Sequence, residues 1–213
     1  MLTPKYREVY DELTDEATAR GFAVQWVVFP GQGPSDGGEL IFEGSLASTL
    51  RAAAEFRPHW VIARSYGCLV AVAAAGTGAE WVRDCHGMAL WGPCTGRTTQ
   101  ARWGTDEKEA ATIESYAKHG TRLATGFYTT MPAIEDRIKD ARCSLRIVRG
   151  ERDEYNTEQD IEKLHALHTA AQPGFRCEKQ LIADLEHHVI RRETTPPEKW
   201  AEYCDALFRL ISN

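Results

Sequence analysis

The sequence has no excess of positive charge and no long apolar segment. Its 25 lysine and arginine residues stand against 31 aspartate and glutamate residues, which gives a formal net charge of −6. Because nucleic acids and anionic membrane surfaces are bound through basic patches, this balance argues against both as partners. No stretch approaches the roughly 20 apolar residues that span a bilayer, and the charged N-terminal stretch has no apolar signal-peptide core. We therefore expect a cytoplasmic protein with no membrane partner.

The sequence also lacks a recognisable metal or cofactor motif. It contains no C-x-x-C pair, and its cysteines are scattered over positions 68, 85, 94, 143, 177 and 204. In a cytosolic chain we expect these residues to be reduced thiols that pack as small buried hydrophobes. His165 and His168 have a spacing that suits a metal, but no third ligand accompanies them. We therefore expect these histidines on an exposed helix face, and we predict neither a metal nor a cofactor.

What is present is an alternation of strand-like and helix-like segments. Apolar runs rich in β-branched and aromatic residues predict strands at 23–29, 59–63, 86–91, 144–150 and 176–182. The intervening stretches predict helices at 4–20, 45–56, 68–76, 157–171 and 197–211. This order predicts a single α/β domain over residues 1–213, with a mainly parallel sheet of about five or six strands flanked by helices. The polar stretch 95–140, helical at about 106–118 and 132–140, interrupts the alternation, and we predict that it forms a small lid.

The first candidate site residue is Ser65, which follows a predicted strand directly. In an open α/β sheet, ligands bind at the carboxyl ends of the strands. Ser65 lies between an apolar run and a helix of small residues, where a sharp strand-to-helix turn would crowd its neighbours. The positions two before and two after it, Ala63 and Gly67, are accordingly expected to be small. The same turn places the backbone N–H of Tyr66 at a helix N-terminus, where it can stabilise an oxyanion.

Two further strand ends carry a carboxylate and an imidazole. Asp153 follows the predicted strand 144–150, and a carboxylate there can hold a histidine in the correct tautomer. Glu151 and Glu154 are the competing acids. Beyond the last predicted strand, His187 and His188 are the two candidate bases. The resulting order of serine, aspartate and histidine is the one used by α/β enzymes with a nucleophile elbow.

These motifs make the sequence similar to the α/β-hydrolase superfamily along the whole chain. The turn Ala63–Gly67 resembles the G-x-S-x-G elbow of the family, with alanine in the first glycine position. Gly150–Asp153 is similar to the acid loop, and its spacing favours Asp153. Ile182–His187 resembles the segment that leads to the catalytic histidine, which favours His187 over His188. Phe29–Asp36 is similar to a G-x-G-x-S stretch that the family often carries two strands before the elbow.

The chain departs from the family at its N-terminus. The family normally has a further central strand that ends in a His-Gly loop and donates a second oxyanion N–H, whereas here only a helix precedes the segment 23–29. Either strand 23–29 lies beside strand 59–63, with Gly31 or Gln32 as the second donor, or a partner chain or another N-terminal segment supplies it. We favour the first arrangement because a gap in the sheet would leave backbone groups unpaired in the core. The strand deficit also raises the chance of a homodimer that covers an open sheet edge.

The resemblance implies a serine hydrolase in which Ser65 attacks an acyl carbonyl, His187 takes its proton and Asp153 orients His187. We predict a small carboxylic ester or thioester as the substrate. The alternatives are transfer of the acyl group to an amine or alcohol, cleavage of a carbon–carbon bond, and a non-catalytic hydrolase-like binding module.

Four residues are candidates for the substrate pocket. Arg64 adjoins the nucleophile and would bind a substrate carboxylate or, as we favour, pair with a local acidic group. Trp103, Phe127 and Tyr128 belong to the predicted lid, where they would serve equally well as lid core or as pocket wall.

Overall fold

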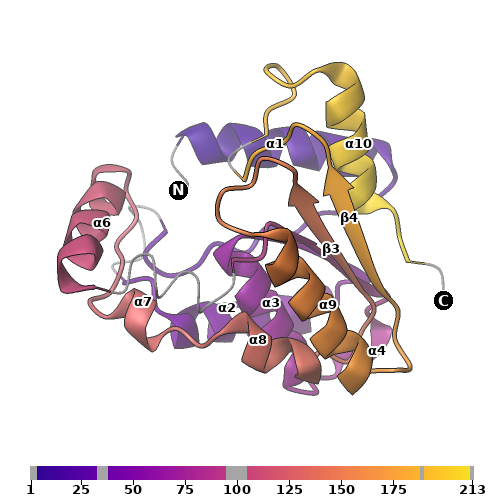
Figure 1. Cartoon of the computed structure of the whole chain (residues 1–213), viewed down its shortest axis with the longest axis horizontal. Coiled ribbons are helices and arrows are strands. Elements are labelled where there is room, and N and C mark those ends of the chain that lie inside the picture. Colours follow the sequence, from indigo (N-terminus) through magenta and orange to yellow (C-terminus); the bar gives the residue numbers. More distant parts are fainter. Residues whose placement is uncertain (1–3, 33–37, 95–104, 188–189, 212–213) are drawn as a thin grey trace.

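A computed structural model describes residues 4–32, 38–94, 105–187 and 190–211 (Figure 1). In this part of the chain, four parallel strands form one sheet in the order β1-β2-β3-β4. The strands are β1 (Trp60–Arg64), β2 (Gly87–Trp91), β3 (Leu145–Gly150) and β4 (Cys177–Ile182). The predicted parallel sheet is therefore confirmed, with four strands rather than five or six. Because the strands are parallel, their carboxyl ends meet at one edge, where Ser65, Asp153 and His187 follow β1, β3 and β4.

Helices cover both faces of the sheet (Figure 1). Two of them, α1 (Pro4–Ala19) and α10 (Pro197–Phe208), pack on one face. The other face is covered by α2 (Phe42–Phe56), α3 (Tyr66–Gly76), α4 (Trp81–Asp84), α8 (Ile134–Arg137), a 3-10 turn η1 (Ile138–Asp140) and α9 (Glu158–Ala171). The remaining helices are α6 (Asp106–Lys118) and α7 (Phe127–Thr130). Within the described residues, no helix has the length and apolar character needed to cross a bilayer.

The central strand β2 shows why these strands read as continuous apolar runs. Met88 and Leu90 join the core formed with α2, α3 and α9, while Ala89 and Trp91 join the core formed with α1 and α10. All four side chains are fully buried. A strand covered on both faces needs apolar residues at every position, so its sequence shows no alternation.

The segment 23–29 is not a strand, contrary to the prediction. Within the described residues it forms no ladder with β1, and the only pairings nearby are isolated bridges at Gln32 and Leu40. Its side chains fix it to α1 instead, because the Trp26 indole N–H donates to Thr14 Oγ1 at 2.7 Å and its ring lies 4.4 Å from that of Tyr10. The apolar side chains Val24 and Trp26 of this segment pack against the core formed with α1 and α10, so they are partly buried without sheet pairing.

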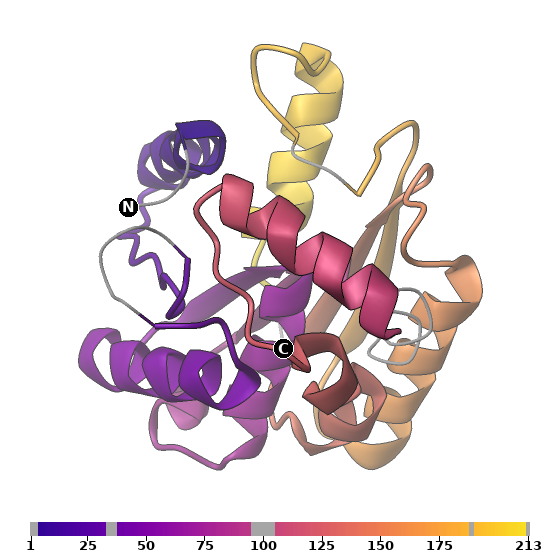
Figure 2. The ribbon, with the colours of Figure 1, turned by 90° about the vertical axis from the view of Figure 1, so that its left-hand side faces the viewer.

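Part of the stretch 95–140 packs into the core of the domain. Ile134 and Ile138 are fully buried in the core that contains α3 and α9, so α8 and η1 belong to the body of the domain. In contrast, α6 stands to one side of the domain and crosses in front of α3 in the second view (Figures 1 and 2). A buried carboxylate joins it to α7, since Glu109 Oε1 accepts the backbone N–H of Tyr128 at 3.1 Å. The lid over 95–140 stays a prediction, and α8 and η1 are the part of that stretch that packs in the core.

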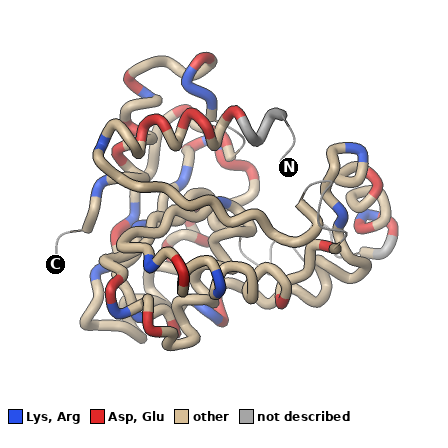
Figure 3. Tube along the Cα trace, turned by 180° about the vertical axis from the view of Figure 1, so that it is seen from behind, with Lys and Arg blue, Asp and Glu red and all other residues tan. Residues whose placement is uncertain are grey.

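The loop that carries His187 is anchored to α1. Acidic residues follow one another along this helix (Figure 3), and Arg191 pairs with two of them, at 2.7 Å from Glu8 Oε2 and 3.0 Å from Glu12 Oε1. The second carboxylate oxygen of Glu12 accepts the backbone N–H of Arg192 at 2.8 Å. Exposed ion pairs contribute little individually, but this network fixes the chain four residues beyond His187 in sequence.

The two histidines of α9 are not on an exposed face, contrary to the prediction. His168 is fully buried, and its Nε2 lies 3.1 Å from the carbonyl oxygens of both Ala141 and Cys143. His165 is half-buried, with Nε2 3.1 Å from the carbonyl oxygen of Cys177. Both side chains therefore bind backbone carbonyls between α9 and the sheet. Spacing along the helix did not reveal which face packs inward.

Candidate active site

Ser65 forms a sharp turn between β1 and α3. Its backbone has φ 50° and ψ −125°, a conformation that residues with a side chain seldom adopt. Hydrogen bonds hold it there, because the Ser65 N–H donates to the Trp91 carbonyl at 2.9 Å and the Ser65 carbonyl accepts the Cys68 N–H at 3.0 Å. Strain that the surroundings maintain in this way is characteristic of functional positions. The turn presents Ser65 at the carboxyl edge of the sheet.

The crowding expected at this turn is not found at Gly67. A Cβ built on Gly67 would meet no described atom within 4 Å apart from its chain neighbours and its own helix backbone. Among the described residues, nothing that a side chain would meet accounts for a small residue at position 67. Ala63 is buried, which is consistent with a small residue there.

Tyr66 connects the turn to two other segments. Its backbone N–H is the first of α3, and no described group accepts it. Its hydroxyl donates to Ser45 Oγ at 3.1 Å, and its ring packs edge-on against Phe29 and Phe127 at centroid distances of 5.7 and 5.1 Å. The Tyr66 ring thereby joins the segment around Phe29 and the helix α7 to the start of α3.

The structure brings Ser65, His187 and Asp153 into one hydrogen-bonded chain. His187 Nε2 lies 3.1 Å from Ser65 Oγ, and His187 Nδ1 lies 2.9 Å from Asp153 Oδ2. His187 and Asp153 are each 5% exposed, so their contact is shielded from water. With Asp153 accepting the Nδ1 proton, the lone pair of Nε2 faces the serine hydroxyl. This is the arrangement that a general base needs in order to activate a serine.

Asp153, rather than Glu151 or Glu154, faces the histidine. Both glutamates are exposed. Asp153 Oδ1 accepts the backbone N–H groups of Tyr155 at 2.8 Å and Asn156 at 3.1 Å, while Oδ2 accepts the Asn156 side-chain amide at 2.9 Å. Burial raises the pKa of Asp153, but the hydrogen bond and charge of His187, followed by the bonds from Asn156 and Tyr155, bring the pKa below its ordinary value. The carboxylate is therefore ionised at neutral pH.

Asn156 is a site residue that the sequence analysis did not identify. Its side chain is 1% exposed, and its Nδ2 reaches both Asp153 Oδ2 and, at 3.4 Å, His187 Nδ1. It follows Asp153 by three residues, and an asparagine in a turn directly after the acid was the only available signal.

The main chain around His187 fixes the position of the imidazole. The Leu185 carbonyl accepts the Arg152 N–H at 2.9 Å, and the His187 carbonyl accepts Arg64 Nη2 at 3.0 Å. Arg64 pairs with no described carboxylate, and its Nε is buried without a partner. Our preferred prediction of an acidic partner for Arg64 is therefore wrong for the described residues. The arginine holds the backbone of the histidine instead.

His187 is a stronger base than free histidine. Burial lowers the pKa of its imidazole, but the hydrogen bonds to Asp153 and Cys94, together with the negative charge available at both, raise it to about 9. His188 lies outside the described residues. Of the two candidate histidines, His187 occupies the position of the base.

Cys94 lies within the site, although the sequence analysis expected only buried, structural cysteines. Its Sγ is 3.3 Å from Ser65 Oγ and 3.7 Å from His187 Nε2. The prediction of burial fails for this residue and for Cys177, which are both partly exposed, while Cys68, Cys85, Cys143 and Cys204 are buried; all six are free thiols.

The remaining predicted residues differ in what the structure shows of them. Gln32 donates its backbone N–H to the Phe29 carbonyl at 3.0 Å, and the role of Gly31 as second donor stays a prediction. Phe127 and Tyr128 are 5% and 7% exposed and pack against each other within the core that contains α3, so neither side chain is openly exposed. Trp103 lies outside the described residues.

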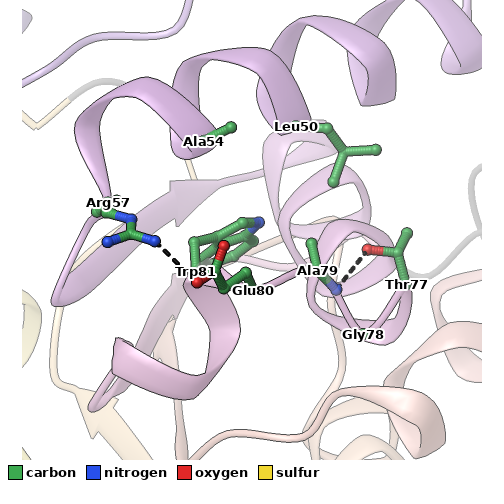
Figure 4. Close-up of a pocket in the computed structure, with 8 residues that line it drawn as sticks. All are labelled: Leu50, Ala54, Arg57, Thr77, Gly78, Ala79, Glu80 and Trp81. Carbon is green, nitrogen blue, oxygen red and sulfur yellow. Dashed lines mark hydrogen bonds and ion pairs between the residues drawn. The ribbon is translucent and has the colours of Figure 1, made fainter.

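A separate surface pocket of about 330 Å³ opens between the C-terminal ends of α2 and α3 and the start of α4 (Figure 4). Eight residues line it: Leu50, Ala54, Arg57, Thr77, Gly78, Ala79, Glu80 and Trp81. Because α3 has 11 residues, its far end lies about 16 Å from Ser65 at 1.5 Å per residue. The pocket contributes no group to the triad. Among the described residues, no group of three or more His, Cys, Asp or Glu side chains is arranged to hold a metal ion.

Comparisons with known proteins give structural matches without sequence matches. No family model matches the chain, and no curated protein matches it in sequence. An esterase of Pyrococcus furiosus superposes with a TM-score of 0.68 at 14% identity, over 99% of this chain and 79% of the esterase. A monoacylglycerol lipase of Paleococcus ferrophilus gives a TM-score of 0.61 at 15% identity, over 92% of this chain and 86% of the lipase. The chain has the α/β-hydrolase fold.

An N-formylmaleamic acid deformylase of Pseudomonas putida extends this result, with a TM-score of 0.63 at 14% identity over 97% of this chain and 86% of the deformylase. The predicted α/β-hydrolase fold is thereby confirmed. At identities this low the similarity concerns architecture, and the chemistry of this hydrolase fold must be argued from its own residues.

Proposed function

We propose that this protein is a serine hydrolase that cleaves a small carboxylic ester or thioester through an acyl-enzyme on Ser65. The observation that carries the proposal is the hydrogen-bonded chain from Asp153 through His187 to Ser65, with distances of 2.9 and 3.1 Å. It is supported by the strained backbone of Ser65, which fixes the hydroxyl against the imidazole.

In the proposed reaction, His187 Nε2 takes the proton of Ser65 Oγ while the oxygen attacks the acyl carbon. Asp153 stabilises the imidazolium that forms, and the imidazolium then protonates the leaving group. A water molecule, activated by the same imidazole, hydrolyses the acyl-enzyme and restores Ser65.

The developing oxyanion needs donors next to Ser65. The backbone N–H of Tyr66 is the first donor, because it lies at the N-terminus of α3 and no described group accepts it. We propose Gly31 as the second donor, since Phe29, two residues before it, packs on the Tyr66 ring. Losing one oxyanion donor typically lowers the rate by ~10²–10³.

The surroundings of Ser65 favour a small acyl group. The buried Phe127 ring of α7 packs directly on Tyr66, and α6 is tied to α7 through the buried carboxylate of Glu109. We propose that α6 and α7 form the lid that limits the length of the acyl chain.

Hydrolysis of a matched series of p-nitrophenyl esters and acyl thioesters of increasing chain length tests the proposal. We expect kcat/KM to be highest for acyl chains of two to four carbons, and an acyl adduct on Ser65 to appear in acid-quenched samples by mass spectrometry. The Ser65→Ala variant should lose both signals. Turnover no faster than that of Ser65→Ala, in wild-type protein with intact circular dichroism, would overturn the proposal.

A further inference from the structure

The site contains two nucleophilic side chains that share one base. Cys94 Sγ and Ser65 Oγ lie 3.3 Å apart, and both are within hydrogen-bonding distance of His187 Nε2, at 3.7 and 3.1 Å respectively. Three segments distant in sequence, after β1, β2 and β4, converge on this point. The hydrolytic mechanism uses the hydroxyl and leaves the thiol without a role.

We propose that Cys94 is a second nucleophile of this site, deprotonated by His187, and that it captures α,β-unsaturated carbonyl compounds by conjugate addition. The inference uses the base of the proposed hydrolysis, but it does not require Ser65 to react.

A thiol gives up its proton to an imidazole more readily than a hydroxyl does. Asp153 Oδ2 lies 2.9 Å from His187 Nδ1 and stabilises the imidazolium that receives the proton. With Sγ 3.7 Å from Nε2, Cys94 is placed to donate that proton, whereas a serine hydroxyl is a much weaker acid. A thiolate beside an imidazolium is the activated pair of cysteine nucleophiles.

The addition balances without any further reactant. The thiol proton moves to His187 Nε2, the thiolate sulfur bonds to the β-carbon, and the π electrons of the double bond move toward the carbonyl to give an enolate. The imidazolium then returns the proton to the α-carbon. An enolate oxygen carries the same charge as the oxyanion of acyl transfer, so the Tyr66 N–H that we propose as the oxyanion donor suits both reactions.

The other five thiols provide an internal comparison. Burial raises the pKa of Cys85 to about 11 and those of Cys177 and Cys204 to about 12. Burial also raises the pKa of Cys68 and Cys143, in both cases far above the ordinary value. Cys177 is the matched control, because it alone among these five is partly exposed.

Limiting N-ethylmaleimide at pH 7, with the adduct mapped by peptide mass spectrometry, tests the proposal. The thiolate is the nucleophile, and about 3% of an ordinary thiol is ionised at this pH, so a Cys94 that His187 deprotonates should react roughly tenfold faster than glutathione. We expect Cys94 to react first and at least tenfold faster than Cys177. The Cys177→Ala variant should leave the rate at Cys94 unchanged, and His187→Ala should lower it about tenfold. A rate at Cys94 no greater than that of glutathione, or one unaffected by His187→Ala, would overturn the inference.

If His187→Ala fails to fold, the inference is tested by the pH dependence of the reaction of wild-type Cys94 with N-ethylmaleimide. The ionisable groups that act on Cys94 are His187 with its partner Asp153, Cys68 of α3 and Tyr128 of α7. We expect the midpoint for Cys94 to lie below that of glutathione, and an equal or higher midpoint would contradict the inference. Labelling of Ser65 by a fluorophosphonate is measured in parallel. If Ser65 is not labelled while Cys94 reacts fast and depends on His187, only the proposed hydrolysis is contradicted. If Ser65 is labelled while Cys94 reacts slowly, only the role of Cys94 is contradicted.

Discussion

Replacing Gly92 with alanine should separate His187 from Asp153 without altering either residue. Gly92 follows β2 with φ +52°, and a Cβ built on it would lie 2.7 Å from His187 Nδ1, 2.8 Å from Cε1 and 3.2 Å from Asp153 Oδ2. The backbone has little freedom to retreat, because the Gly92 N–H donates to the Val148 carbonyl at 2.9 Å. The methyl group therefore displaces the imidazole from the atom that orients it.

The size of the effect follows from what the imidazole loses. Removing the orienting carboxylate of a serine–histidine–aspartate triad lowers kcat by about 10⁴, which sets the upper limit here. We expect Gly92→Ala to lower kcat/KM for the best ester by about 10²–10⁴, with a similar fall in the rate of fluorophosphonate labelling. The left-handed backbone costs alanine roughly 1–2 kcal/mol, which corresponds to a decrease in Tm of about 2–8 °C for a chain of this size.

Gly78→Ala is the matched control for this experiment. Gly78 also has a positive φ, +72°, but a Cβ there would meet nothing within 4 Å. It should show a comparable decrease in Tm with unchanged labelling. Labelling of Gly92→Ala at the wild-type rate would refute the claim that contact between His187 and Asp153 activates the serine.

Three further predictions concern the surroundings of the triad. Asn156→Ala should lower kcat more than it changes KM, because the Asp153 carboxylate loses a buried donor. For the same reason it should lower the free energy of unfolding in urea by about 1.5–3 kcal/mol. An unchanged kcat would exclude a positioning role for Asn156. The folded-state pKa of His187, about 9, lies above the ordinary 6.5, so its stabilisation is complete below pH 6.5 and is lost as pH rises through 9. We therefore expect the free energy of unfolding to fall over that range in wild-type protein more than in His187→Gln, and the labelling of Ser65 to accelerate over the same range; parallel curves for the two proteins would contradict this. Burial lowers the pKa of His168, although its hydrogen bonds to two carbonyls raise it, so the stability gained from keeping the imidazole neutral should decline as pH falls below about 6.5. His168→Leu should remove that decline and should cost at least about 1 kcal/mol, because two buried carbonyls lose their donor. Unfolding free energies that follow the same pH curve as wild type would show that His168 is not the group responsible.

Ser65, Asp153 and His187 could be predicted because each lies within five residues after the end of a parallel strand. Strands rich in buried apolar residues are readable from sequence, and parallel strands bring their carboxyl ends together without further information. Ser65, Asp153 and His187 could therefore be selected before any contact was known. The choice of Asp153 over the adjacent glutamates depended on resemblance, and the structure explains it by burial.

What the sequence analysis missed depends on packing between distant segments. Cys94 lies 29 residues from Ser65 and 93 from His187 along the chain, and no local pattern connects them. Gly92 is constrained by the imidazole rather than by its own turn alone. The segment 23–29 has the β-branched and aromatic composition of a strand, but composition does not show whether the backbone is paired. His168 illustrates the same limit, because helical spacing does not show which face is covered.

The most direct test of the proposed mechanism is labelling of the purified protein with a fluorophosphonate, followed by intact mass measurement and peptide mapping. The hydrogen-bonded chain of Ser65, His187 and Asp153 predicts a single adduct on Ser65, absent from Ser65→Ala and strongly reduced in His187→Ala. A folded wild-type protein that gains no adduct, or gains it on another residue, would contradict the assignment of Ser65 as an activated nucleophile.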